Sequence, residues 1–282
     1  MSNSFKKILI PVDFTTSTEV AVKKGLELAE DGTVIHLLHV LNKPIMLKDV
    51  FVRKKTDRFS LQEVDQRMKQ WQSTIEAFNE NVKVETWVAM KCAVQNVIEI
   101  KAKQMDADLI IICKKSQHSW LPFLNTVCPN KLVQNIGKPV LTVKPGSIHN
   151  KVKTVIIPVS EEIIDYKIEV ISTICQKFRV NVHLVTFANS DTSPDEFFAA
   201  PLLQLYQWIK SNLHCPVEYN VLYGANRAKA LLKYAEKVNA DMLLVCPKME
   251  TKLSWLNTHI SDVLPPASKM QVLAVQPATT YS

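Results

Sequence analysis

The chain has 282 residues, of which 47% are hydrophobic and 22% charged, and its formal net charge is +7. This length suits two ordinary domains, and the composition is that of a globular protein rather than a disordered or fibrous one. No apolar run approaches the roughly 20 residues needed to cross a bilayer, and the N-terminus lacks a signal-peptide pattern. We therefore expect a cytoplasmic protein without a membrane partner.

The first third of the chain is predicted to alternate strands and helices. An apolar, β-branched strand at 7–13 is followed by a helical pattern, in which Thr16 and Glu19 are spaced as a capping box. A second strand, at 33–40, precedes an irregular stretch that contains the basic segment 48–58.

A second capping box, Ser60 and Glu63, is predicted to open a helix that ends near residue 79. Pro129 suits the first turn of a later short helix. The remaining elements of this half are strand 82–88, helix 93–105, strand 108–113 and strand 139–144.

The second half repeats the first weakly but in the same order. Six segment pairs match: 6–14 with 152–160, 34–40 with 181–187, 82–88 with 215–221, 106–115 with 239–248, 123–127 with 255–259, and 138–145 with 270–277. A duplication is the simplest explanation, with a boundary at 145–152, so we divide the chain into domains 1–147 and 148–282. Each domain is expected to be an α/β unit with a five-stranded, parallel, doubly wound sheet.

The last strand of each domain is short, apolar and followed by proline. As sheet edges, these strands would expose unpaired backbone groups, so pairing them would cover both. We predict that the domains form an internal pseudo-dimer through this interface, which comprises Val140, Leu141, Val143, Val272, Leu273 and Val275.

Charge and cysteine usage argue for no special partner. Residues 1–150 hold 21 Lys and Arg against 15 Asp and Glu, whereas residues 151–282 hold 13 against 12. The basic segment 48–58 is interpreted as a solvated loop, because a nucleic-acid surface more often combines clustered arginines with aromatic residues. The six cysteines form no C-x-x-C pair, and we expect reduced, mostly buried thiols.

Glycine is scarce, with only five in the chain, and the closest two are seven residues apart. Neither G-x-G-x-x-G nor G-x-x-x-x-G-K-[ST] can therefore occur, which excludes both standard phosphate-binding fingerprints.

Six segments follow the pattern of a known family: "ILIPVDFTTSTEVAVKKGLELA" at the start, "IHLLHV", "VIEIKAKQMDADLIIIC" and "KPVLTVKP", with "ALLKYAEKVNADMLLVCPK" and "QVLAVQP" in the second half. This is a resemblance to the universal stress protein family. It implies five-stranded α/β domains that often dimerise through the last strand, in a family that contains both ATP binders and non-binders.

The binders carry an aspartate after the first strand, which resembles Asp13, and a glycine motif after the fourth strand. Without gaps, the motif glycines fall on Cys113, Ser116 and Thr126, followed by Val127. In the second half they fall on Cys246, Met249 and His259, and Ser160 replaces the aspartate. The hypothetical nucleotide site of domain 1 would comprise Pro11, Asp13, Val40, Ile112, Cys113, Ser116, Thr126 and Val127.

Side chains at the glycine positions would block the close approach of backbone N–H groups to phosphate oxygens. We therefore expect no resident cofactor, although ATP or AMP in domain 1 is the alternative. Asp13 could contact adenine or cap the helix near Thr16. Lys114 and Lys115 could hold phosphates, but a solvated turn is the favoured interpretation.

No catalytic residue and no metal site are predicted. His36 and His39 lie three apart on a strand, so they face opposite sides and cannot share a metal; one of them is expected to satisfy a core contact. The favoured hypothesis is a non-enzymatic stress-response protein that acts through a regulatory protein partner or a homodimer. The alternative is an ATP- or AMP-binding regulator that uses domain 1 only.

Overall fold

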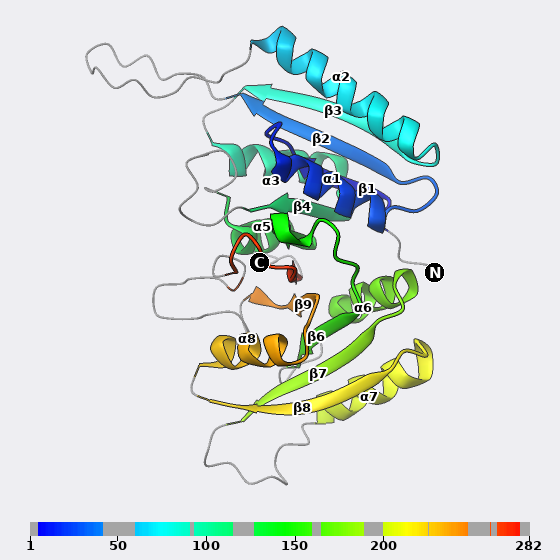
Figure 1. The fold of residues 1–282 in the computed structure, drawn as a ribbon, viewed down its shortest axis with the longest axis vertical. Helices are drawn as coiled ribbons and strands as arrows, with labels where there is room; N and C mark the ends of the chain where they lie inside the picture. The colour runs from blue at the N-terminus through cyan, green and yellow to red at the C-terminus, as the bar shows by residue number, and fades with distance from the viewer. Residues whose placement is uncertain are drawn as a thin grey trace, which may run out of the picture.

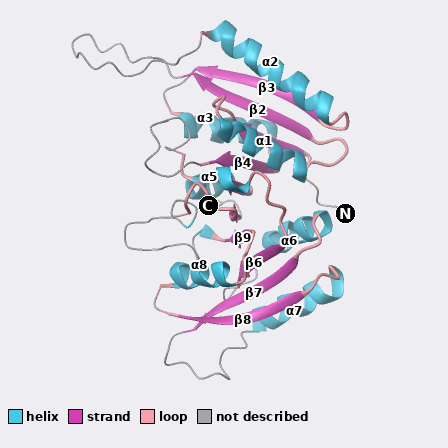
Figure 2. Cartoon of the chain, viewed as in Figure 1, coloured by secondary structure: helices cyan, strands magenta, loops and turns pink. Residues whose placement is uncertain are grey.

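The computed structural model describes residues 5–41, 60–90, 93–114, 127–159, 165–188, 200–224, 226–247, 260 and 264–276. Its described strands form one ten-stranded sheet in the order β3-β2-β1-β4-β5-β10-β9-β6-β7-β8 (Figure 1). Read from its outer strand inward, each half has the same order: β3-β2-β1-β4-β5 in the first half and β8-β7-β6-β9-β10 in the second. Helices lie on both faces of the sheet (Figure 2). The predicted α/β class and mostly parallel sheet are confirmed.

The first half contributes five strands and four described helices. They are β1 Lys7–Pro11, α1 Thr16–Leu28, β2 Val34–Leu41, α2 Leu61–Phe78, β3 Lys83–Met90, α3 Val94–Met105, β4 Leu109–Cys113, α5 Pro129–Ile136 and β5 Val140–Val143, and a 3-10 turn, η1, follows at Pro145–Ser147.

The second half contributes five further strands and three described helices. They are β6 Thr154–Pro158, α6 Asp165–Lys177, β7 Asn181–Ala188, α7 Ala200–Asn212, β8 Val217–Tyr223, α8 Arg227–Lys237, β9 Met242–Val245 and β10 Gln271–Ala274.

The central strands are apolar because helices cover the sheet on both faces. All five residues of β4 are buried. One core cluster packs α1, α2, α6 and α7 against one face of the sheet, and a second packs α3, α5 and α8 against the other. Both clusters draw residues from both halves of the chain.

Nine strand pairs in the described sheet include one antiparallel pair, in which β10 runs beside β5. Leu273 is paired with Leu141, and Val272 with Thr142. Elsewhere between the two halves, the Lys24 ammonium donates to the Asn150 carbonyl at 2.6 Å and the Lys177 ammonium to the Ala29 carbonyl at 2.5 Å. The two halves therefore share backbone pairing as well as side-chain contacts.

The predicted helix caps differ in outcome. Ser60 and Glu63 form the predicted capping box, with the Ser60 amide 2.6 Å from the Glu63 carboxylate. The box predicted for Thr16 and Glu19 is wrong: Thr15 is the N-cap of α1, and its hydroxyl accepts from the Ser17 amide at 3.2 Å. Adjacent threonines made the register ambiguous by one residue.

An aspartate holds the first strand of each half in place. Asp108, just before β4, accepts from the backbone amides of Lys6 and Lys7 at 3.0 and 2.8 Å. Asp241, just before β9, accepts in the same way from Lys153 and Thr154 at 2.8 and 2.9 Å. The same carboxylate clamp therefore occurs twice.

We expect Asp108→Ala to lower the free energy of unfolding by about 1–3 kcal/mol, because two backbone donors lose a charged acceptor. Asp108→Asn, which keeps one acceptor oxygen, should lose less. Asp65→Ala is the matched control, since Asp65 makes only an exposed ion pair with Lys69 among described residues, worth about 0.5 kcal/mol or less. Equal losses for Asp108→Ala and Asp65→Ala in urea unfolding would contradict the clamp.

Candidate functional site

The carboxyl ends of β1, β2 and β4 lie side by side at one edge of the sheet. Pro11 ends β1 opposite Leu38, and β1 also pairs with β4, so its end lies next to that of β4. In open α/β sheets, ligands bind at such an edge where the strand order reverses. Pro11, Val40, Ile112 and Cys113 lie at or near the ends of these strands, and Asp13 follows β1. Val40, Ile112 and Val127 belong to one core cluster and Cys113 to the other, and all four are almost completely buried.

Asp13 organises the turn between β1 and α1. Its Oδ1 atom accepts from the Thr15 amide at 3.1 Å, the Thr15 hydroxyl at 2.6 Å and the Thr18 hydroxyl at 3.0 Å. The Thr18 hydroxyl also accepts from the Asp13 amide at 3.0 Å. Asp13 thus holds Thr15, the capping residue, rather than capping α1 itself. Within the described part of the chain, Asp13 accepts its hydrogen bonds through Oδ1 alone.

Phe14 packs over the end of β2. Its φ of 56° is in the left-handed region, which a large side chain rarely adopts. The Phe14 ring lies 4.6 Å from the His39 ring, centroid to centroid, and the Arg67 guanidinium lies 5.8 Å from the Phe14 ring. The buried His39 Nδ1 donates to the Val12 carbonyl at 2.8 Å, which is the expected core contact of one histidine.

Lys114 corrects one prediction. It follows β4 directly, and the sequence favoured a solvated turn there, yet its side chain is only 6% exposed. The Lys114 amide donates to the Val143 carbonyl at 3.0 Å, and its ammonium donates to the Val127 carbonyl at 3.1 Å. Lys114 therefore ties the end of β4 to the segment that enters α5.

A buried lysine also lies at the same edge of the second half. The Lys167 ammonium, on α6, donates to the carbonyl of Pro158, the last residue of β6, at 2.6 Å. Lys167 is 6% exposed, and Cys246, the first residue after β9, is also buried. The sequence comparison missed Lys167 because it has no counterpart in the family motif.

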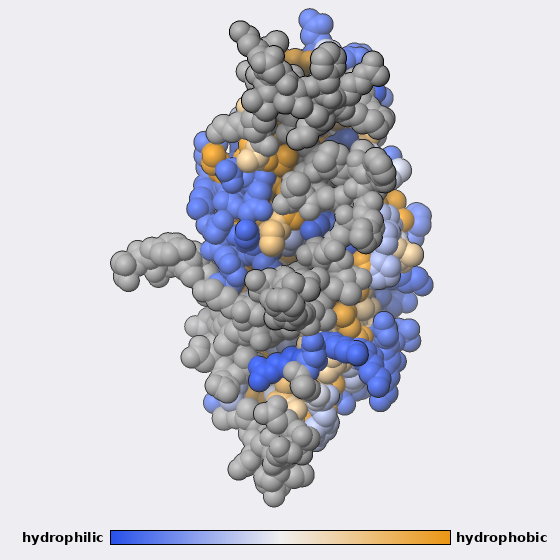
Figure 3. Space-filling view, turned by 90° about the vertical axis from the view of Figure 1, so that its left-hand side faces the viewer, coloured by the Kyte–Doolittle hydropathy of each residue, from blue (hydrophilic) through white to orange (hydrophobic). Residues whose placement is uncertain are grey.

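Other predicted residues lie outside the described residues: Lys115, Ser116, Thr126, Ser160, Met249, His259 and the basic segment 48–58. In the ranges that the structure covers, no group of three or more His, Cys, Asp or Glu side chains could hold a metal ion. Seen toward the carboxyl ends of the strands, the described surface mixes hydrophilic side chains with smaller hydrophobic areas (Figure 3).

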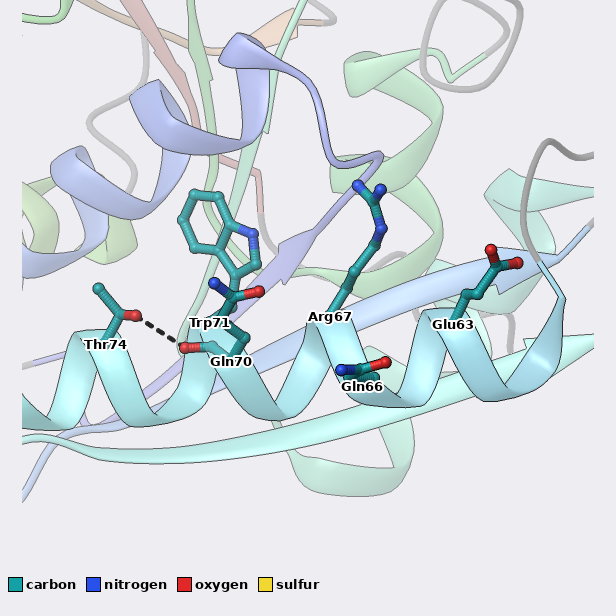
Figure 4. Close-up of a pocket in the computed structure, with 6 residues that line it drawn as sticks. All are labelled: Glu63, Gln66, Arg67, Gln70, Trp71 and Thr74. Atoms are coloured by element: carbon teal, nitrogen blue, oxygen red, sulfur yellow. Dashed lines mark hydrogen bonds between the residues drawn. The ribbon is translucent and has the colours of Figure 1, made fainter.

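A cavity of about 570 Å³ lies along helix α2. Six α2 side chains line it, and Arg67 and Trp71 project from the helix on the same side (Figure 4): Glu63, Gln66, Arg67, Gln70, Trp71 and Thr74. The lining is mainly polar, and the Thr74 hydroxyl donates back to the Gln70 carbonyl at 2.8 Å. The repeat of these residues every three or four positions was the only sequence signal for this cavity.

The sheet order, the helices on both faces and the edge at β1, β2 and β4 define a doubly wound α/β protein. Residues 4–144, half of the chain, match the model of the Universal stress protein family. The chain belongs to the universal stress protein family. No curated protein sequence matches it significantly.

Solved structures share the whole fold at low sequence identity. A universal stress protein from Archaeoglobus fulgidus has a TM-score of 0.64 at 13% identity, with 97% of each chain covered. A functionally unknown protein from Pseudomonas aeruginosa has a TM-score of 0.61 at 16% identity, covering 97% of this chain and 93% of its own.

The cytoplasmic domain of a prokaryotic cation chloride cotransporter is also similar, with a TM-score of 0.53 at 9% identity, covering 97% of this chain and 96% of its own. The fold alone therefore does not identify an activity. As for this chain, none of the helices among its described residues has the length and apolar character that a membrane crossing requires.

Proposed function

We propose that this universal stress protein is a tandem, non-enzymatic member that acts by associating with a regulatory protein partner. We further propose that its nucleotide site is degenerate. The observation that supports this proposal is the buried ammonium of Lys114, which donates to the Val127 carbonyl at 3.1 Å.

This contact has the wrong polarity for a phosphate site. A phosphate loop turns backbone N–H groups toward the anion, whereas here the carbonyl of Val127 turns toward a lysine. Cys113, at the first motif-glycine position, is 2% exposed, so its side chain occupies space that glycine would leave empty. Together these features favour a first half in which the carboxyl edge of the sheet has no place for a nucleotide phosphate.

The tandem arrangement is supported by features that recur at matched positions. Asp108 and Asp241 make the same backbone clamp. Two residues before them, Asp106 and Asn239 both have a φ of 50°. A left-handed residue that few side chains tolerate, repeated at the same point before β4 and β9, is economically explained by duplication.

The second candidate is an ATP- or AMP-binding regulator that uses the first half only. Asp13 favours it, because this half-buried carboxylate lies at the carboxyl edge and directs only Oδ1 to its described partners. The remaining oxygen has the acceptor chemistry needed for an adenine amino group.

Isothermal titration of the purified chain with ATP and with AMP separates the two candidates. We expect no binding tighter than about 100 μM for either nucleotide, and no nucleotide released when the purified protein is denatured. Binding below that limit, lost in Asp13→Ala, would establish the second candidate instead.

The titration needs a control because Asp13 also holds the start of α1. Asp13→Ala should therefore be compared with Asp31→Ala, an exposed aspartate whose only described contact uses its backbone carbonyl. Circular dichroism should show both variants folded. A loss of binding in both variants would point to general damage rather than to a nucleotide contact.

A further inference from the structure

Two cysteines from distant parts of the second half meet between α6 and the start of β8. Cys175 lies near the end of α6, and Cys215 lies between α7 and β8, 40 residues later. Their sulfur atoms are 3.7 Å apart, and both residues are half-buried thiols. The sequence offered no sign of this pair, because it contains no C-x-x-C motif.

The two sulfurs lie in apolar surroundings. Both cysteines pack against the same core cluster as Phe178 and Leu213. Cys175 also lines a small apolar cavity beneath α6, together with Ile174. A disulfide has a sulfur–sulfur distance of about 2.05 Å, so the atoms must approach by roughly 1.7 Å.

We propose that Cys175 and Cys215 are a redox-modified pair that forms an intramolecular disulfide when the protein meets a hydroperoxide. The bond would join the end of α6 to the start of β8, which is the edge strand of the sheet. This inference is independent of whether the first half binds a nucleotide.

The chemistry assigns different roles to the two sulfurs. Cys175 lies on α6 and lines the apolar cavity beneath that helix, whereas Cys215 lies in the segment before β8. Burial, and then the neighbouring Cys215, raise the pKa of the Cys175 thiol above its usual value. We therefore assign the first attack to Cys215 and the second to Cys175. The Cys215 sulfur attacks the hydroperoxide and breaks its O–O bond. The Cys215 proton passes to the departing oxygen, which leaves a sulfenic acid and an alcohol or water. The Cys175 sulfur then attacks the sulfenic sulfur, and water leaves with the Cys175 proton. Two thiols lose two electrons, which reduce one peroxide bond.

The disulfide is detectable directly in the full chain. The reduced protein is treated with hydrogen peroxide, its remaining thiols are blocked, and it is digested with trypsin without reductant. Trypsin releases Cys175 in the peptide 168–177 and Cys215 in the peptide 211–227. We expect mass spectrometry to find these two peptides joined, and dithiothreitol to separate them.

Single substitutions distinguish the roles. In Cys175→Ser, Cys215 should accumulate as a sulfenic acid that dimedone traps, whereas in Cys215→Ser, Cys175 should remain a thiol. Cys128→Ser is the matched control, because Cys128 is half-buried and free, and it should form the disulfide as the unmodified chain does.

Oxidation should also raise the melting temperature of the unmodified chain by several degrees, since the bond closes a loop of about 40 residues. It should leave both serine variants at their reduced values. Peptides 168–177 and 211–227 recovered only as separate thiols, or joined to other cysteines instead, would overturn the proposal.

Discussion

Replacing Leu141 with aspartate should destabilise the protein more than any other change considered. Leu141 and its partner Leu273 are 0% and 1% exposed, at the centre of the antiparallel pair between β5 and β10. An ionised carboxylate there would be buried without a partner, which costs more than about 4 kcal/mol of a total stability of roughly 5–15 kcal/mol. Thermal unfolding should therefore show a large loss, and small-angle scattering should show a less compact chain.

The matched control places the same charge on the surface. Leu203 lies on α7 and is 46% exposed, so Leu203→Asp should change the free energy of unfolding by no more than about 0.5 kcal/mol. Leu273→Asp should behave like Leu141→Asp, because the two side chains share one site. A Leu141→Asp protein as stable and compact as Leu203→Asp would show that the seam does not hold the two halves together.

The strands and most helices could be predicted because their signals are local. β4 is an unbroken apolar run, which is the pattern expected of a strand that is buried on both faces. The start of α2 could be predicted from Ser60 and Glu63, because their capping contacts join residues only three positions apart. Strand edges also carry information, because their backbone groups need partners. β5 and β10 are the short strands that were predicted to pair with each other, and the structure places them side by side.

The details of the candidate site depend on contacts that no local pattern encodes. Lys114 is followed by a second lysine, a pattern that predicts a solvated turn. Its side chain is buried instead, and its ammonium donates to the Val127 carbonyl, thirteen residues away. Phe14 combines a left-handed backbone with ring packing against His39 from the next strand, and neither feature has a local sequence signal. Cys175 and Cys215 meet only because α6 and the start of β8 lie together in the fold.

The second large effect concerns Gly146, in the η1 turn that follows β5. Its amide donates to the Pro266 carbonyl at 2.9 Å. A Cβ atom on Gly146 would lie 2.2 Å from the Ala267 carbonyl oxygen and 2.4 Å from the carbonyl carbon. The obstacle is backbone that leads into β10, so no side-chain rotation can relieve it. Gly146→Ala should therefore cost about 3 kcal/mol or more and lower the melting temperature by roughly 6–12 °C.

Gly25→Ala provides the comparison, because its steric conflict is of a different kind. On α1, a Cβ at Gly25 would lie 2.8 Å from the Cδ1 methyl of Ile10, which can rotate away. Alanine in a helix interior also gains about 1 kcal/mol over glycine, so the two effects should nearly cancel. Differential scanning calorimetry should thus show a large loss for Gly146→Ala and a small change for Gly25→Ala. A change as small for Gly146→Ala as that expected for Gly25→Ala would mean that the turn after β5 can move away from Ala267, and that the two halves are less rigidly joined than this contact implies.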